Sequence, residues 1–210
     1  MRHIAHTLTL VLMLILGFML GTRYQMVNDN VEGLQNLVAV QKSKIGELRS
    51  ANSHLTTVVR LREVLEENRV RLPRASVEEM ATRVDQVSRK YGVSSDMIFA
   101  VIQAESSFDP LAVSDRGAVG LMQLLPSTAR GLAEELNIHW TDDSILWDPL
   151  TNIEMGTYYL RTLISRFNSV EVALAAYNHG PTRIAALQAT SAALPLEYPG
   201  RVFASLQERN

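Results

Sequence analysis

The sequence has no cysteine among its 210 residues. This absence excludes a disulfide scaffold, a thiolate metal site and a cysteine nucleophile. Histidine is also scarce, and the five that occur are scattered without the spacing of metal ligands. We therefore expect no metal and no other cofactor. Hydrophobic residues make up 47% of the chain and charged residues 20%, a balance that excludes global disorder.

Acidic and basic residues are unevenly distributed. Residues 1–74 hold ten Lys and Arg against six Asp and Glu, whereas residues 75–210 hold ten against sixteen. Because a nucleic-acid-binding surface needs an excess of positive charge, we expect no nucleic acid as partner of the acidic C-terminal part.

Residues 1–23 are expected to form a membrane anchor. No charged residue lies between Arg2 and Arg23, and residues 8–20 are apolar except for one threonine and one glycine. A helix of about 20 uncharged residues spans the roughly 30 Å hydrocarbon layer. A cleaved signal sequence is the alternative, although no Ala-x-Ala cleavage site follows the apolar run. Arg2 favours an N-terminus on the inner side of the membrane.

Residues 24–74 are expected to form a helical stalk. Apolar residues recur at alternating steps of four and three, which is the spacing of a coiled-coil seam. The a positions are Val31, Val38, Ile45, Asn52 and Val59, and the d positions include Leu34, Leu48 and Leu55. This pattern favours a parallel homodimer, with the polar residue fixing the register. The alternative is a single helix that packs its apolar stripe on the following domain; Pro73 ends the stalk in either case.

Residues 75–210 are expected to form an all-α domain with its own core. Pro126 suits the first turn of a helix, and Asp148, followed by proline, is a typical N-cap. Ser169 is expected to cap a further helix. No alternating strand of useful length occurs in this part of the sequence.

Glu105 is the first candidate for chemistry. It follows the apolar residues 97–102 and falls in the last turn of the helix expected there. Apolar surroundings and the negative end of the helix dipole both disfavour the carboxylate and so raise its pKa. A carboxyl group that stays protonated near neutral pH can act as a general acid. The alternative is a solvated residue at a helix end.

Three further polar residues stand in apolar or small-residue surroundings. Gln123 lies in an apolar run, so its amide must be paired by the protein or by a ligand. Tyr177 is either a core aromatic residue or a phenol directed at Glu105 or a sugar. His179 is a rival catalyst, but its place beside a helix-ending glycine favours the surface.

Three blocks of sequence resemble a known family. Residues 105–110 (ESSFDP), 117–126 (GAVGLMQLLP) and 175–180 (AAYNHG) occur in the order and spacing of the signature blocks of SLT-type lytic transglycosylases. These enzymes cleave peptidoglycan and have a goose-lysozyme-like fold. Further positions also fit the pattern, namely Ser114, Asn152, Gly156, Tyr159 and Leu160. The resemblance covers residues 76–205 and includes neither anchor nor stalk.

The resemblance implies a role for each matching residue. Glu105 would protonate the β-1,4 glycosidic oxygen between N-acetylmuramic acid and N-acetylglucosamine. It would then accept the proton of the muramyl C6 hydroxyl, which closes a 1,6-anhydro ring. The substrate-binding residues implied are Ser114, Gln123, Leu125, Tyr177 and Asn178. The implied partners are peptidoglycan glycan strands, with the domain in the periplasm and the anchor in the inner membrane.

One carboxylate suffices for such a reaction because the attacking hydroxyl belongs to the substrate itself. Asp109 and Asp115 are the other carboxylates nearby, and Asp109 is expected to form a turn. If Asp115 were essential, a lysozyme-type hydrolase would be favoured. A glycan-binding module without catalysis is the second alternative.

The sequence departs from the family pattern at two places. Leu125 stands where methionine is frequent. In the C-terminal block Glu197 matches, but Tyr198 and Arg201 replace the threonine and tyrosine of the pattern. This departure implies that the groove at that end of the site recognises a different feature of the glycan or is partly remodelled.

Overall fold

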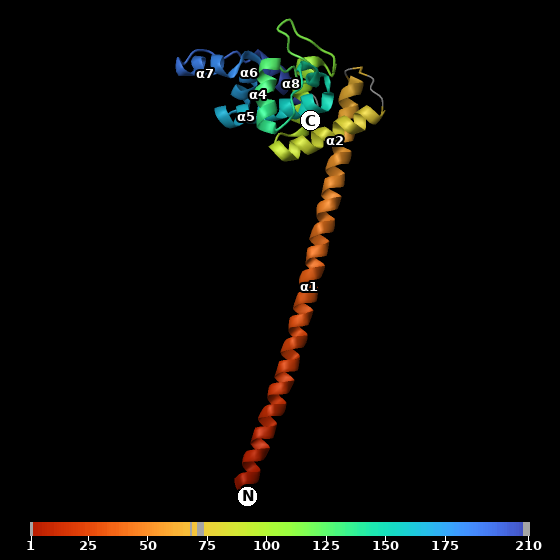
Figure 1. Cartoon of the computed structure of the whole chain (residues 1–210), viewed down its shortest axis with the longest axis vertical. Helices are drawn as coiled ribbons and strands as arrows, with labels where there is room; N and C mark the ends of the chain where they lie inside the picture. The colour runs from red at the N-terminus through yellow and green to blue at the C-terminus, as the bar shows by residue number, and fades with distance from the viewer. Residues whose placement is uncertain (1, 68, 71–73, 208–210) are drawn as a thin grey trace. The chain divides into compact units, whose positions relative to one another are not determined.

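The computed structural model of the chain describes most of its residues and divides into two units. It covers residues 2–67, 69–70 and 74–207, of which residues 2–9, 74 and 75 are described by their backbone alone. The units are Met1–Asn52 and Ser53–Asn210. Helix α1 (Arg2–Glu67) begins in the first unit and ends in the second (Figure 1).

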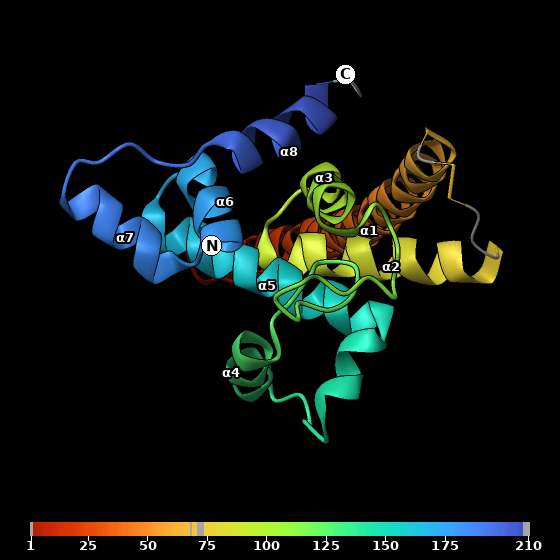
Figure 2. The ribbon, with the colours of Figure 1, turned by 90° about the horizontal axis from the view of Figure 1, so that it is seen from above.

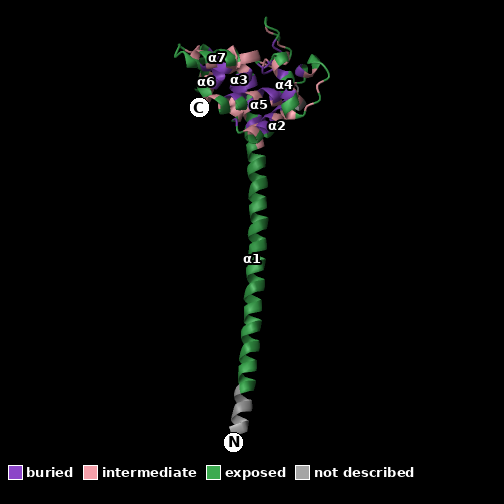
Figure 3. Cartoon of the chain, turned by 60° about the vertical axis from the view of Figure 1, so that its left-hand side comes forward, coloured by how far each residue is buried: buried purple, intermediate pink, exposed green. Residues whose placement is uncertain are grey.

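The first unit is formed by α1 alone. All side chains described between residues 10 and 52 are exposed (Figure 3). By length and composition α1 can cross a membrane, because it contains an apolar window with a mean hydropathy of 1.6. Residues of the heptad seam are exposed too, with Val31 at 45% and Leu34 at 62%. The apolar helix expected for an anchor and stalk is therefore present, whereas its pairing with a second copy stays a prediction.

The regular secondary structure described in the second unit is helical, which confirms the all-α prediction. After the end of α1 it contains α2 (Arg74–Tyr91), α3 (Ser95–Ser106), α4 (Pro126–Leu136), the 3-10 helix η1 (Asp143–Trp147), α5 (Pro149–Phe167), α6 (Val170–His179), α7 (Pro181–Ala189) and α8 (Glu197–Gln207). Within the described residues, β pairing is limited to two isolated bridges, Val113 with Val119 and Val119 with Leu124.

Several helices begin where the sequence predicted. The Asp148 carboxylate accepts a hydrogen bond of 2.8 Å from the Thr151 amide at the start of α5. Ser169 accepts one of 3.3 Å from the Val172 amide at the start of α6. Pro126 is the first residue of α4, a position at which its missing amide hydrogen costs nothing.

The core forms where α2, α3, α5, α6 and α8 meet. Helix α5 packs against α2, α4 and α6, while α3 packs beside α8 (Figure 2). Fully buried side chains of this core include Val84, Phe99, Ile102, Phe108, Met122, Leu160, Leu174 and Tyr198. Burial of such a side chain contributes about 1.5–3 kcal/mol, so this core holds α3 firmly.

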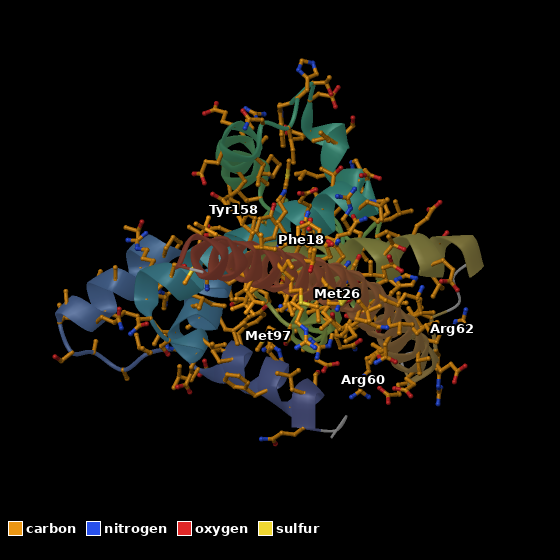
Figure 4. The ribbon with its side chains drawn as sticks, turned by 90° about the horizontal axis from the view of Figure 1, so that it is seen from below. Phe18, Met26, Arg60, Arg62, Met97 and Tyr158 are labelled. Carbon is orange, nitrogen blue, oxygen red and sulfur yellow. The ribbon has the colours of Figure 1, made fainter. Side chains whose placement is uncertain are left out.

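The last turns of α1 belong to the same core. Val58, Leu61, Val64 and Leu65 are between 0% and 5% exposed. Two arginines of this segment, labelled in Figure 4, form ion pairs with neighbouring helices: Arg60 with Asp96 at 3.1 Å and Arg62 with Glu78 at 2.8 Å.

The compact second unit begins at Ser53, whereas the sequence predicted a domain boundary at 74/75. Pro73, expected to end the stalk, lies outside the described residues, and α1 ends at Glu67. Residues 53–67 thus pack on the domain with a face other than the heptad seam, because Leu55 and Val59 of the seam stay 62% and 53% exposed.

Candidate active site

Glu105 lies in the last turn of α3, directly after the buried part of that helix. The chain then reverses through two consecutive residues with positive φ, Ser107 at 51° and Phe108 at 64°. The ring of Phe108 is buried and lies 6.3 Å from that of Phe99, so packing holds this unfavourable backbone in place. Glu105 is thereby fixed at the end of a rigid helix.

The surroundings of Glu105 favour its protonated form. Burial raises the pKa of Glu105 from its ordinary value of 4.5 to about 7, while the Tyr198 hydroxyl and the positive charge of Arg201 act in the opposite direction. Both protonation states are therefore populated near neutral pH. This is the property expected of a group that first donates and then accepts a proton.

Tyr198 and Arg201 come to Glu105 from α8, a contact that sequence reasoning missed. Tyr198 is 1% exposed, and its hydroxyl makes no hydrogen bond of standard geometry with any residue that the structure describes. The Tyr198 hydroxyl therefore lowers the pKa of Glu105 as a neighbouring donor, without a hydrogen bond of standard geometry. The guanidinium carbon of Arg201 lies 5.5 Å from the centre of the Tyr198 ring. The only signal in the sequence was the departure from the family pattern at these two positions.

A cleft of about 490 Å³ opens beside Glu105. It brings together all six residues predicted for the site, namely Glu105, Ser114, Gln123, Leu125, Tyr177 and Asn178. They come from the end of α3, the loop before α4 and the end of α6. Leu125 and Asn178 are exposed on the cleft, and the roles implied for all six residues stay predictions.

Ser114 and Gln123 each keep one hydrogen-bonding function for a ligand. The Ser114 oxygen accepts a hydrogen bond of 3.0 Å from the Ala118 amide, which leaves its own hydrogen to donate. The Gln123 amide nitrogen donates to the carbonyl oxygens of Ala112 and Gly120, both at 3.0 Å. The protein therefore pairs the nitrogen of this amide, and its oxygen faces no donor among the described residues.

The loop that carries these residues is fixed at Met122 by two helices. Asn152 of α5 is buried and accepts a hydrogen bond of 2.8 Å from the Met122 amide, and it donates to the carbonyl oxygens of Val119 and Leu146. Tyr177 of α6 donates to the Met122 carbonyl oxygen at 2.7 Å. The Tyr177 proton is thus committed to the loop, and this residue supports the site from within the protein.

Glycine is required at two places of this junction. A Cβ on Gly120, whose φ is 81°, would lie 2.8 Å from the Leu146 carbonyl oxygen. A Cβ on Gly156 would lie 2.7 Å from the Cβ of Met122. The loop approaches α5 this closely only because both side chains are absent.

Nine further residues line the cleft: Asp115, Arg116, Ala118, Leu124, Thr128, Tyr159, His179, Gly180 and Pro181. Among them are the two rival candidates named from the sequence, Asp115 and His179. The rings of Tyr159 and Tyr177 are 5.3 Å apart. Burial and the charges of Arg183, Arg116 and Arg201 lower the pKa of His179, against an opposing effect of Glu197.

The remaining candidate carboxylates are placed differently. Asp109 accepts a hydrogen bond of 2.9 Å from the Leu111 amide, which confirms the predicted turn. Asp115 is exposed at the wall of the cleft. In the described part of the chain, no three side chains of His, Asp or Glu gather in a way that would hold a metal ion.

Several proteins named as lytic transglycosylases are similar to this chain over part of their length. "Membrane-bound lytic murein transglycosylase C" of Serratia proteamaculans is 42% identical over 86 residues, which are 40% of this chain and 24% of that protein. Lytic transglycosylase Slt of Pseudomonas aeruginosa, solved as an inactive Glu-to-Gln mutant, is 32% identical with a TM-score of 0.50. The match covers 60% of this chain and 21% of the solved one.

A second solved structure, a 70-kDa soluble lytic transglycosylase in complex with bulgecin A, is 29% identical with a TM-score of 0.50. The match covers 52% of this chain and 18% of the solved one. This chain thus spans only about a quarter or less of the length of these relatives. The model of the family described as "Transglycosylase SLT domain" matches residues 83–195, more than half of the chain. The chain belongs to the SLT transglycosylase family.

Proposed function

We propose that the chain is a peptidoglycan lytic transglycosylase in which Glu105 is the single acid and base. The observation that carries this proposal is a partly buried carboxyl with a pKa of about 7 at a cleft of an SLT domain. The inactive form of the related Slt protein, which replaces a glutamate by glutamine, gives independent support.

The proposed reaction uses Glu105 twice, first as an acid and then as a base. Protonated Glu105 gives its proton to the glycosidic oxygen as the bond to the muramyl C1 breaks. The C6 hydroxyl of the same sugar attacks C1, and its proton passes to the Glu105 carboxylate, which restores the acid. The attack is intramolecular, so no second carboxylate is needed to activate water. Ser114 can donate to the acetamido oxygen, and the Gln123 oxygen can accept from a sugar hydroxyl.

The products of the detergent-solubilised full chain test this function. Mass spectrometry of the released muropeptides should show ends one water lighter than those of hydrolysis. Glu105→Gln should lower their rate of release by about 10²–10⁴-fold. Asp115→Asn is the matched control, because this carboxylate lines the same cleft but is exposed.

Each alternative function has its own result in this experiment. Products one water heavier, lost with Asp115→Asn, would identify a lysozyme-type hydrolase. Retained binding to the cell wall without release of any product would identify a glycan-binding module.

We also propose that the chain is anchored in the inner membrane with its second unit in the periplasm. Support comes from the exposed apolar residues 10–20 of α1, from Arg2 before them, and from the relative named membrane-bound. Protease added to spheroplasts should digest the second unit while the anchor stays with the membrane after carbonate washing. Protection of that unit from protease would contradict the proposed orientation.

The exposed heptad seam supports pairing of two copies in parallel. In analytical ultracentrifugation of the detergent-solubilised chain we expect a dimer that Val38→Glu dissociates. Val40→Glu is the control, because it lies outside the a and d positions on the same helix. A monomer at all concentrations would contradict the dimer.

A further inference from the structure

The Tyr198 hydroxyl is a buried hydrogen-bond donor without an acceptor. Tyr198 is 1% exposed and belongs to the main hydrophobic core of the second unit. Its hydroxyl makes no hydrogen bond of standard geometry with any residue of the described ranges. A buried donor that stays unpaired destabilises the folded state, and native proteins contain few of them. An acceptor that forms only during function would account for it.

Glu105 is the carboxyl group beside this donor. Helix α8, which carries Tyr198, packs beside α3, which carries Glu105 (Figure 2). Burial raises the pKa of Glu105 to about 7, and the neighbouring Tyr198 hydroxyl opposes this rise. Loss of the proton converts the carboxyl group into a carboxylate, which is a much stronger acceptor of hydrogen bonds. Each turnover therefore changes what stands beside the Tyr198 hydroxyl.

The other groups that act on Glu105 cannot supply this hydrogen bond. Tyr177 is also buried and close enough for Glu105 to affect its pKa, but its hydroxyl already donates to the Met122 carbonyl oxygen at 2.7 Å. Arg201 is exposed, and its guanidinium carbon lies 5.5 Å from the centre of the Tyr198 ring. Burial raises the pKa of Tyr198 well above 10, so this phenol keeps its proton at neutral pH.

We propose that the Tyr198 hydroxyl is a positioning group, which donates a hydrogen bond to Glu105 only after Glu105 has given its proton to the glycosidic oxygen. This inference rests on the proposed function, because that function makes Glu105 an acid and then a base.

The hydrogen bond forms and is lost within one turnover. In the first step the proton of Glu105 moves to the leaving oxygen, the bond from that oxygen to C1 breaks, and the carboxylate accepts from Tyr198. In the second step the C6 hydroxyl attacks C1 and its proton passes to the carboxylate, so the acceptor is weakened again. Tyr198 keeps its own proton throughout.

The donor makes Glu105 a stronger acid than its burial alone would allow. A buried carboxylate without a donor forms less readily, which slows transfer of the proton to the leaving oxygen. The family pattern has threonine at position 198, so a phenol at this place distinguishes this chain from the pattern.

The test removes the hydroxyl and keeps the ring. Tyr198→Phe is prepared in the detergent-solubilised full chain, with Tyr158→Phe as the matched control. The Tyr158 hydroxyl also donates to a carboxylate, that of Glu135 at 2.8 Å, but Tyr158 does not line the cleft. Two properties are measured: kcat and kcat/KM for release of muropeptides as a function of pH, and the melting temperature at pH 5 and pH 8.

The activity of Tyr198→Phe should respond to pH differently from that of the parent. The pH at which kcat/KM falls should rise by about one unit, which is a tenfold change in the acid dissociation constant of Glu105. The value of kcat should fall by up to about tenfold, the change expected if that unit is fully expressed in the transition state. Tyr158→Phe should leave both values unchanged.

The melting temperature separates this role from a structural one. At pH 5 Glu105 is protonated, so Tyr198→Phe removes an unpaired hydroxyl and should melt at or above the parent. At pH 8 the carboxylate has lost its donor, and the variant should melt below the parent. With Glu105→Gln in the same chain no carboxylate forms, so Tyr198→Phe should have the same effect at both pH values.

An unchanged pH midpoint of kcat/KM in Tyr198→Phe would overturn the proposal. An equal loss of melting temperature at pH 5 and pH 8 would do so too, as would a variant that does not fold at pH 5, because either result shows a structural hydroxyl. Failure of the proposed function is recognised separately. In that case the parent releases no anhydro products, while the melting temperatures still report whether Tyr198 meets the carboxylate.

Discussion

The last turns of α1 should be indispensable to the stability of the second unit. Leu61 is fully buried among residues of the core, whereas Leu55 on the same segment is 62% exposed. In residues 53–210, Leu61→Ala should lower the free energy of unfolding by about 2–5 kcal/mol, the cost of a leucine truncated in a core. Leu55→Ala should change it by no more than about 0.5 kcal/mol. Urea unfolding followed by circular dichroism measures both values.

The same reasoning applies to truncation at the boundary first expected from the sequence. Residues 75–210 lack four buried side chains, Val58, Leu61, Val64 and Leu65. Their loss removes about 6–12 kcal/mol of burial energy at about 1.5–3 kcal/mol each. Since a domain has only about 5–15 kcal/mol of net stability, no cooperative unfolding transition is expected. Unfolding of residues 75–210 at the same midpoint as residues 53–210 would refute this reasoning, as would a Leu61→Ala variant as stable as Leu55→Ala.

Other predictions concern the acid and its surroundings. The kcat/KM for peptidoglycan should fall as pH rises through about 7, because Glu105 of the free enzyme must be protonated to start the reaction. Arg201→Gln should move the midpoint of this fall to higher pH, since the charge of Arg201 lowers the pKa of Glu105. An unchanged midpoint would contradict this effect of Arg201 on Glu105. The raised pKa means that the folded state binds more protons than the unfolded state between pH 4.5 and 7, so stability is greatest below this window and falls as pH rises through it. Glu105→Gln should abolish this fall and be more stable at pH 8 by up to about 3 kcal/mol in thermal melts, and equal pH profiles of the two proteins would count against a buried carboxyl. Gly156→Ala should destabilise the fold by about 1–3 kcal/mol, because the added Cβ would meet Met122. Gly131→Ala in α4 should stabilise the fold by about 0.5–1 kcal/mol, because its Cβ would point into open space and alanine favours the helix. The opposite order of the two stabilities in chemical unfolding would refute this contrast.

Features with local causes could be predicted from the sequence. Asp148 and Ser169 cap helices through amides three residues away, so the residues themselves specify where α5 and α6 begin. The grouping of the six candidate residues in one cleft could be predicted because five of them lie in the three blocks of the family pattern and Ser114 also fits that pattern. Glu105 was marked by its place after a run of apolar residues, and its partial burial follows from that place.

Features that depend on distant contacts could not be predicted. The heptad spacing continues through Val59, and the same apolar stripe suits either a second helix or a domain core. Only the folded structure shows that another face of this helix, with Val58 and Leu61, enters the core, while Val59 of the stripe stays exposed. Tyr198 and Arg201 are far from Glu105 in sequence and lie beyond the residues matched by the family model. Their effect on Glu105 arises from the packing of α8 beside α3.

The two hydrogen bonds at Met122 have a consequence for the thermodynamics of binding. Asn152 and Tyr177 satisfy both the amide and the carbonyl of this one residue, so the loop is ordered before any ligand arrives. The conformational entropy of the loop, about 1–2 kcal/mol for each residue fixed, is then lost during folding and not during association. A ligand in the cleft then meets a loop that is already ordered, and the free energy of its contacts is available for affinity.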